Sequence, residues 1–255
     1  MCAEDESVRK IGNTARWYVP MGLKKWFNRR GIINVVEMEW WQESSIPGKP
    51  EYSVVATPAM VPPRQFQTNQ QHWSARHPFH TNTTLWNSYL VIHRPTPSSP
   101  SHPLLFHAGD TGYVDSLYSQ IAAIYGSGCE LALLPIGSYC PRWHLRQQHC
   151  DPQDVVKMHL ELGAKKTVGV HYATWILSDE HYLAPPRELE VAAVESKVSA
   201  TVMPGQLGRT TVIPLERVES SEEENDEDST KSLDEKNSLE LALTEVRNGK
   251  SVVWR

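Results

Sequence analysis

The chain has 255 residues, with 30 acidic and 25 basic side chains and a formal net charge of -5 at pH 7. Its four cysteines form no C-x-x-C pair, and the chain has neither a signal-peptide pattern nor an apolar run of the roughly 18 residues that a membrane span needs. These features argue against a transmembrane or disulfide-stapled secreted protein. We expect an intracellular protein, cytoplasmic or peripheral on internal membranes, without a nucleic-acid partner.

The first elements alternate between strand and helix patterns. Arg16–Val19 and Asn34–Trp41 are predicted strands, and Met21–Arg30 is a predicted helix that ends at Gly31. Tyr52–Thr57 is the next predicted strand. This alternation indicates a layered α/β domain.

The predicted helix Met21–Arg30 is amphipathic, with Leu23, Trp26 and Phe27 on one side and basic residues elsewhere. An apolar stripe of this spacing is typical of a helix that covers a sheet, and we favour that interpretation. The alternative is peripheral contact of this helix with an anionic membrane surface.

The second half of the chain continues the same pattern. Predicted strands span Leu104–Phe106, Glu130–Pro135 and Thr167–Val170, and a predicted helix spans Val114–Tyr125. The clearest helix runs to Leu162, with Asp151 as N-cap and Pro152 at the first helical position.

We predict that the folded domain covers residues 1–215 and that residues 216–255 form an acidic, largely disordered tail. Seven acidic residues lie between positions 219 and 228, so the rest of the chain is nearly balanced in charge. A solvated linker is the favoured interpretation, with an acidic interaction tail as the alternative. Residues 238–246 could form one short helix.

Two chemistry-bearing residues follow predicted strands. Asp110 comes after Leu104–Phe106, and His171 comes directly after Thr167–Val170. A carboxylate and an imidazole from neighbouring strand ends suit a divalent metal such as zinc. Taken singly, Asp110 could cap a turn and His171 could be a core histidine.

A larger set of motifs in order along the chain resembles the metallo-β-lactamase superfamily, and within it the N-acylphosphatidylethanolamine-hydrolysing phospholipases D. The match runs from about Val8 to about Leu189 and implies an αββα sandwich that is incomplete at its N-terminus. The matching motifs are Arg16-Trp17-Tyr18-Val19-Pro20-Met21-Gly22-Leu23, Glu39-Trp40-Trp41, Gln71-His72-Trp73, Ala108-Gly109-Asp110-Thr111-Gly112-Tyr113, Pro135-Ile136-Gly137, Pro141-Arg142-Trp143, Gln148-His149 and Glu180-His181-Tyr182-Leu183.

The resemblance implies roles for individual residues. His72 would be a ligand of one zinc, Asp110 the carboxylate that bridges two zincs, and His171 a ligand of the second. Gln148 and His149 match positions beside the phosphate, which implies substrate binding by both and proton transfer by His149. Asp110 and His149 are therefore the predicted catalytic residues.

The activity that the resemblance implies is zinc-dependent hydrolysis of N-acylphosphatidylethanolamine to an N-acylethanolamine and phosphatidic acid. A different phosphodiester or a lactone is an alternative substrate, since the superfamily uses one site for many reactions. A phospholipid is thus the expected partner. A homo-oligomer is a further possibility.

The family takes its other metal ligands from a His-x-His-x-Asp-His motif, and this string is absent from the chain. We therefore expect two zincs in a complete site but only part of the ligand set here. Either the sequence is a truncated form of a full enzyme, which we favour, or it is a catalytically inactive half-domain that acts as a binding or regulatory partner.

Overall fold

The computed structural model describes residues 2–60, 84–206, 208, 210, 212 and 213. The elements are α1 Cys2–Ile11, η1 Gly12–Thr14, β1 Trp17–Pro20, α2 Lys24–Asn28, β2 Val35–Met38, β3 Glu43–Ile46, β4 Lys49–Pro58, β5 Asn87–His93, β6 His102–His107, α3 Leu117–Tyr125, β7 Leu131–Pro135, α4 Arg142–Leu145, α5 Pro152–Leu162, β8 Lys166–Val170, α6 Ala184–Glu195 and β9 Val202–Pro204.

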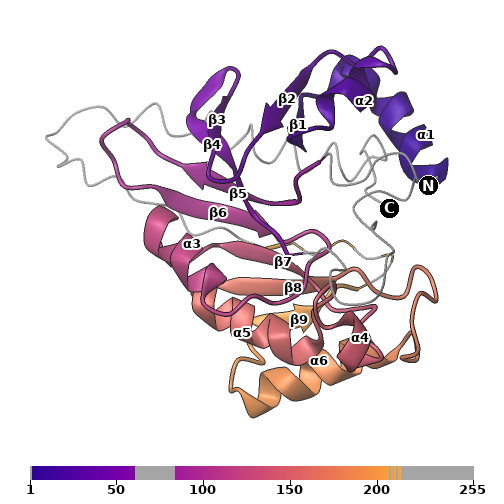
Figure 1. Ribbon diagram of the computed structural model, residues 1–255. Helices are drawn as coiled ribbons and strands as arrows, with labels where there is room; N and C mark the ends of the chain where they lie inside the picture. Colours follow the sequence, from indigo (N-terminus) through magenta and orange to yellow (C-terminus); the bar gives the residue numbers. More distant parts are fainter. Residues whose placement is uncertain (1, 61–83, 207, 209, 211, 214–255) are drawn as a thin grey trace, which may run out of the picture. The chain divides into compact units, whose positions relative to one another are not determined.

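A mixed seven-stranded sheet forms the centre of the fold, in the order β3-β4-β5-β6-β7-β8-β9 (Figure 1). Its first half, from β3 to β6, is antiparallel, whereas β6 to β9 run parallel. The parallel half requires crossover connections, and α3, α5 and α6 lie within them. The carboxyl ends of β6, β7 and β8 therefore meet at one edge of the sheet.

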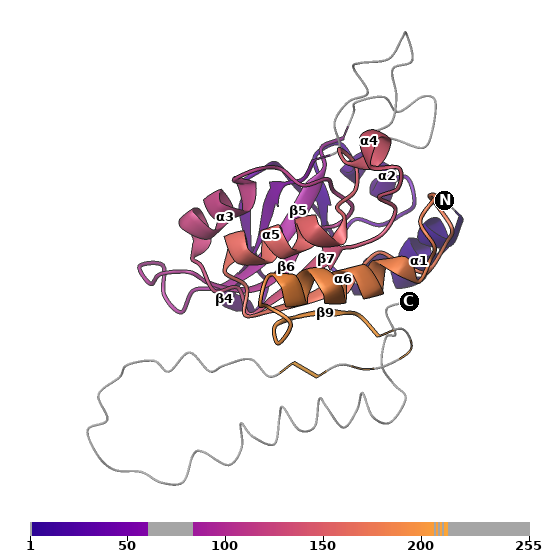
Figure 2. The same ribbon diagram turned by 90° about the horizontal axis from the view of Figure 1, so that it is seen from below.

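The helices of these crossovers cover one face of the large sheet (Figures 1 and 2). Residues of strand β5 alternate between half-buried and buried, so one face of this strand lies under the helices. Leu90 and Ile92 join the main core, in which Phe106 of β6 contacts Tyr118 of α3 edge to face, with ring centroids 6.1 Å apart. Burial of this apolar face is the main source of stability for the parallel half.

The opposite face of the large sheet packs on a second, two-stranded sheet made of β1 and β2. Met38 of β2 lies in a small core with Val54 and Ala56 of β4. Outside this sheet, Phe27 of α2 packs with Val19 and with further apolar residues of α1, β1 and β2. The layers are therefore helix, sheet, sheet and helix, as the resemblance implied.

The structure also decides the role of the helix that carries Trp26. Phe27 is buried, and Leu23 and Trp26 pack against the same small core. The core-packing interpretation is thus confirmed for this stripe. The helix is shorter than predicted, spanning only Lys24–Asn28.

The clearest predicted helix is confirmed in detail as α5. The Asp151 carboxylate accepts a hydrogen bond from the backbone N–H of Asp154, and the two residues form a capping box. Gly163 ends the helix in the left-handed conformation.

Other predicted elements differ from the structure. Strand β2 ends at Met38, because the chain turns at Trp40 and Trp41, and Trp41 has a φ of 68°. Strands β3, β5 and β9 and helix α6 were not predicted from the sequence patterns. The predicted tail 216–255 and the helix within it lie outside the described residues. In the described part of the chain, no helix is long and apolar enough to cross a membrane.

Candidate metal centre

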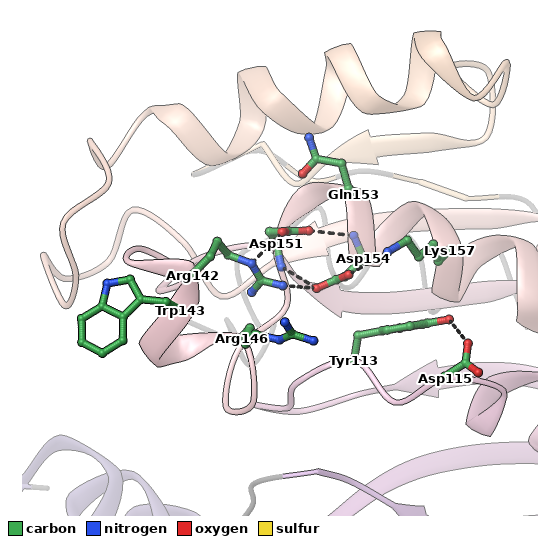
Figure 3. Close-up of a pocket in the computed structure, with 9 residues that line it drawn as sticks. All are labelled: Tyr113, Asp115, Arg142, Trp143, Arg146, Asp151, Gln153, Asp154 and Lys157. Carbon is green, nitrogen blue, oxygen red and sulfur yellow. Dashed lines mark hydrogen bonds and ion pairs between the residues drawn. The ribbon is translucent and has the colours of Figure 1, made fainter. Parts of the chain in front are cut away.

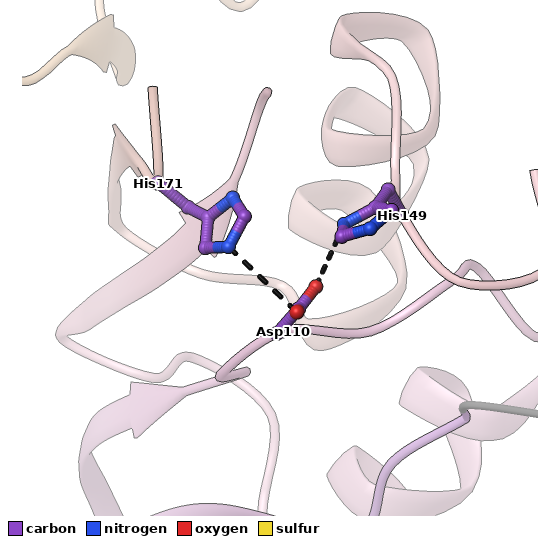
Figure 4. A group of neighbouring side chains, drawn as sticks. All are labelled: Asp110, His149 and His171. Atoms are coloured by element: carbon purple, nitrogen blue, oxygen red, sulfur yellow. Dashed lines mark ion pairs between the residues drawn. The ribbon is translucent and has the colours of Figure 1, made fainter. Parts of the chain in front are cut away.

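Three side chains from separate segments converge at the carboxyl edge of the parallel strands. Asp110 lies three residues beyond β6, His171 directly follows β8, and His149 lies in the connection between α4 and α5. Each residue offers one potential ligand atom, and all three atoms lie within 4.8 Å of one another. These three side chains form the candidate site (Figure 4).

The Asp110 carboxylate lies between the two imidazole rings and faces each with a different oxygen (Figure 4). Its Oδ1 is 2.7 Å from Nδ1 of His149, and its Oδ2 is 3.8 Å from Nε2 of His171. The side chains of Asp110, His149 and His171 are 48%, 15% and 30% exposed, so the group is accessible to a ligand.

The Asp110 turn is fixed by its contact with Met60, two residues beyond the end of β4. The backbone N–H of Met60 donates to Oγ1 of Thr111, and the backbone N–H of Gly112 donates to the carbonyl of Met60. Thr111 itself is fully buried. Asp110 is thus held next to the point where the chain enters residues 61–83.

The backbone around His149 is held by hydrogen bonds of Arg142 and Cys150. The Arg142 guanidinium donates from Nη1 to the carbonyl of His149 at 2.9 Å and also pairs with both Asp151 and Asp154 of the α5 capping box. The Cys150 thiol donates to the carbonyl of Thr111 at 3.1 Å. The segment that carries His149 is therefore tied both to α5 and to the Asp110 turn.

Gly112 allows the Asp110 turn to approach this segment closely. A Cβ at position 112 would lie 2.6 Å from the carbonyl oxygen of Gln147, a distance that real Cβ atoms essentially never show. A glycine is therefore required for the two loops to touch.

His171 depends on an unusual backbone conformation and on a second glycine. Its φ is 61°, in the left-handed region that few non-glycine residues adopt. A Cβ on Gly137, just after β7, would lie 2.3 Å from the carbonyl oxygen of His171. The turn after β7 thus packs directly on the backbone of His171.

Glu180 holds the loop that follows Gly137. Its two carboxylate oxygens accept the backbone N–H groups of Ser138, at 2.7 Å, and Cys140, at 3.0 Å, and Oε1 also accepts the Ser178 hydroxyl. Burial by itself would raise the pKa of Glu180, but these hydrogen bonds outweigh it and lower the pKa below 4.5.

His107 is a further histidine near the centre. Its Nδ1 accepts the backbone N–H of Gly109 at 2.9 Å, which helps shape the Asp110 turn. Burial lowers the pKa of His107, and the nearby His171 lowers it further. A neutral His107 is therefore favoured beside the site.

Three of the five predicted site residues come together here, namely Asp110, His149 and His171. His72 lies outside the described residues. Gln148 is half-buried and precedes His149, but its side chain is not one of the three converging groups. The positioning roles of Arg142, Gly112 and Cys150 were not predicted from the sequence, in which their only signal is their place in or beside the matched motifs.

A cavity of about 630 Å³ lies beside the segment that carries His149, but none of the three converging residues lines it (Figure 3). Arg142, Arg146 and Lys157 face it together with three acidic residues. Its charges are therefore balanced, which gives no preference for an anion. The lining residues are Tyr113, Asp115, Arg142, Trp143, Arg146, Asp151, Gln153, Asp154 and Lys157.

The fold and the chain's sequence define its class. The family described as beta-lactamase superfamily domain matches residues 6–172, and the chain belongs to this family. A metallo hydrolase from the hyperthermophilic archaeon Ignicoccus hospitalis shares the fold with a TM-score of 0.59 at 19% identity, covering 84% of this chain and 74% of that one.

Two curated relatives are more specific. The chain is 42% identical over 178 residues to the mitochondrial N-acyl-phosphatidylethanolamine-hydrolyzing phospholipase D of Saccharomyces cerevisiae, covering 69% of this chain and 34% of that protein. It is 28% identical to N-acyl-phosphatidylethanolamine-hydrolyzing phospholipase D 1 of Caenorhabditis elegans, covering 72% of this chain and 49% of that protein. The chain thus spans about a third to a half of the length of these relatives.

The converging residues fit the metal that the superfamily implies. Two imidazoles and one carboxylate are donors that zinc and related divalent cations accept. Nδ1 of His149 is buried and makes no hydrogen bond with the described part of the chain, although Asp110 is close. A buried polar atom without a hydrogen bond is costly, and a cation at this point would satisfy it.

Gly137→Ala should disturb the centre through crowding, because the new Cβ would overlap the carbonyl of His171. We expect a loss of about 1–3 kcal/mol in the free energy of unfolding, the usual cost of overpacking, measured by urea denaturation. Gly31→Ala is the control, since its Cβ would meet nothing within 4 Å and it adds only strain at a φ of 76°. Equal losses in the two variants would contradict the crowding argument.

Glu180→Gln should reduce stability in a pH-dependent way. Because the folded protein lowers the pKa of Glu180, this carboxylate stabilises the fold above its ordinary pKa of 4.5 and stops doing so as pH falls through the lowered value. Melting temperatures of both forms should therefore differ at pH 7 and converge in acid. A difference in melting temperature that is constant with pH would show that the charge of Glu180 does not cause the loss of stability.

Proposed function

We propose that this chain carries part of the active site of a metal-dependent phosphodiesterase of the N-acylphosphatidylethanolamine-hydrolysing phospholipase D type. The observation that carries the proposal is the convergence of Asp110, His149 and His171 in a chain with 42% identity to the yeast relative. The substrate would be N-acylphosphatidylethanolamine, and the products an N-acylethanolamine and phosphatidic acid.

Asp110 and His171 would hold zinc, together with His72 from the segment outside the described residues. Zinc bound there would lower the pKa of a water molecule and polarise a phosphoryl oxygen. Asp110 suits a bridging position, because its two oxygens already face different histidines. An amide at this position would offer only one neutral oxygen.

Gln148 and His149 would act on the substrate side of the centre. Gln148 can donate from its amide to a phosphate oxygen. His149 has one ring nitrogen beside Asp110, which leaves the other free to donate a proton to the departing alkoxide oxygen. The ion pair between Nδ1 of His149 and Oδ1 of Asp110 would keep the ring in this orientation.

Access of a lipid to the centre is consistent with the exposure of Asp110, whose side chain is 48% exposed. This substrate lies in a membrane, so we also propose that the protein contacts a bilayer peripherally. Parallel assays on N-acylphosphatidylethanolamine vesicles and on a soluble phosphodiester would separate a lipid hydrolase from a general phosphodiesterase. Turnover of the soluble ester alone would overturn the lipid assignment.

Asp110→Asn should abolish turnover in the protein that carries this chain. We expect kcat/KM on N-acylphosphatidylethanolamine to fall by more than about 100-fold, because loss of an outer-shell partner alone typically costs 10–100-fold. Asp115→Asn is the matched control, since Asp115 is exposed and lies away from the three converging groups. Near-normal turnover by Asp110→Asn would exclude Asp110 as a metal-bridging residue.

A further inference from the structure

The connection between β8 and α6 carries three consecutive large apolar side chains that are exposed. These residues, called the apolar tip below, are Trp175, Ile176 and Leu177, with exposed fractions of 72%, 83% and 63%. Single exposed apolar residues are common on protein surfaces, but contiguous ones mark a contact surface for a partner or a membrane. The apolar tip is therefore the part of this connection whose exposure needs an explanation.

The apolar tip projects from a segment that is fixed at both ends. Before the tip, the Tyr172 hydroxyl donates a hydrogen bond to the carbonyl of Gly205. After it, the backbone N–H of Asp179 donates to the carbonyl of Cys140 at 3.1 Å, and Glu180 accepts two further backbone N–H groups of the same loop. The exposure of the tip is therefore a defined feature of the fold.

A fourth exposed apolar side chain lies on the same side of the molecule. The hydrogen bond between Asp179 and Cys140 ties the segment of the tip to the residues that lead into α4. Trp143 of α4 is 79% exposed, and its ring points away from the other side chains drawn in Figure 3. Helix α4 and the connection between β8 and α6 lie on one side of the large sheet (Figure 1).

The two exposed segments lie on either side of the candidate metal centre in the sequence. The apolar tip follows His171 by four to six residues, and Trp143 precedes His149 by six. Both histidines converge on Asp110 at the carboxyl edge of the parallel strands. A partner that covers the apolar tip and Trp143 would therefore lie next to this edge.

We propose that the apolar tip and Trp143 insert into the surface of a lipid bilayer and bring the candidate centre to a substrate held there. This inference rests on the proposed function for the identity of the lipid. Tryptophan is enriched at membrane–water interfaces, where its ring lies at the level of the head groups. Isoleucine and leucine add apolar area that enters the boundary between head groups and acyl chains.

The charge beside Trp143 suits the lipid of the proposed function. The nitrogen of N-acylphosphatidylethanolamine is an amide, so its head group keeps only the negative charge of the phosphate. Arg146 lies three residues beyond Trp143 and is exposed, so both side chains lie near one side of this short helical segment. Such a pair of apolar and cationic side chains favours an anionic membrane surface.

The exposed area is too small for a stable contact with a second copy of the chain. The four side chains together expose on the order of 500 Å². A standard protein–protein interface buries about 800 Å² on each partner and needs a complementary surface opposite. A fluid bilayer needs no such complementarity, so it is the occupant that a narrow projecting tip fits.

Vesicle flotation of the purified protein tests the inference. Ile176→Ser combined with Leu177→Ser should weaken binding to phosphatidylcholine vesicles that contain N-acylphosphatidylethanolamine by about 10-fold or more. Ile124→Ser combined with Leu160→Ser is the matched control, because these residues are 57% and 56% exposed but lie near the ends of α3 and α5, which lead to the starts of β7 and β8. The control should bind vesicles as the wild type does.

A fluorescent label at the tip gives a direct readout of insertion. An environment-sensitive dye on Ile176→Cys should shift its emission to the blue when the vesicles are added. The same dye on Ile124→Cys should show no shift, and labelled wild-type protein gives the background from the native cysteines. This measurement keeps the apolar side chains of Trp175 and Leu177, so it tests insertion even if the double serine variant folds poorly.

Two outcomes would overturn the inference. One is unchanged vesicle binding of the variant with serine at 176 and 177, together with no blue shift of the dye at position 176. The other is a change in oligomeric state of this variant without lipid, measured by sedimentation, which would assign the tip to a second copy. Failure of the proposed function looks different, because a protein that inserts its tip but does not hydrolyse the lipid would refute only the activity.

Discussion

The parallel pairing of β6, β7 and β8 is the constraint on which the candidate centre depends. In this pairing Phe106 lies opposite Ala132, and Pro135 lies opposite Val170, so the three strands end at the same edge. Residues that follow these strands are brought together although they are some 60 positions apart along the chain, as for Asp110 and His171. Sheets of this kind place ligands at the carboxyl ends of their strands.

Close backbone contacts then convert this common edge into a defined geometry. Gly112 and Gly137 let loops touch at distances that any side chain would prevent, and the approaching backbones carry or adjoin the two histidines. Arg142 adds a polar link, since one guanidinium joins the capping box of α5 to the carbonyl of His149. The centre is thus positioned by its loops as much as by the strands.

The two histidines reach Asp110 in different ways, which gives the carboxylate two distinct sides. His149 comes from a helix connection and is the more buried, whereas His171 comes from a strand end with a left-handed backbone. A carboxylate with a histidine on each side could bind a metal with one oxygen while its other oxygen contacts a histidine. The side chain of Asp110 itself stays 48% exposed.

The sequence by itself determined the alternation of strands and helices, the cap at Asp151, and Asp110, His149 and His171 as site candidates. These features depend on local patterns or short motifs, which consist of residues close together in the sequence. Only the tertiary structure decided the short strands β3 and β9, the length of α2 and the closeness of Nδ1 of His149 to Asp110. Such features arise from contacts between segments far apart in the chain, and no local pattern records them.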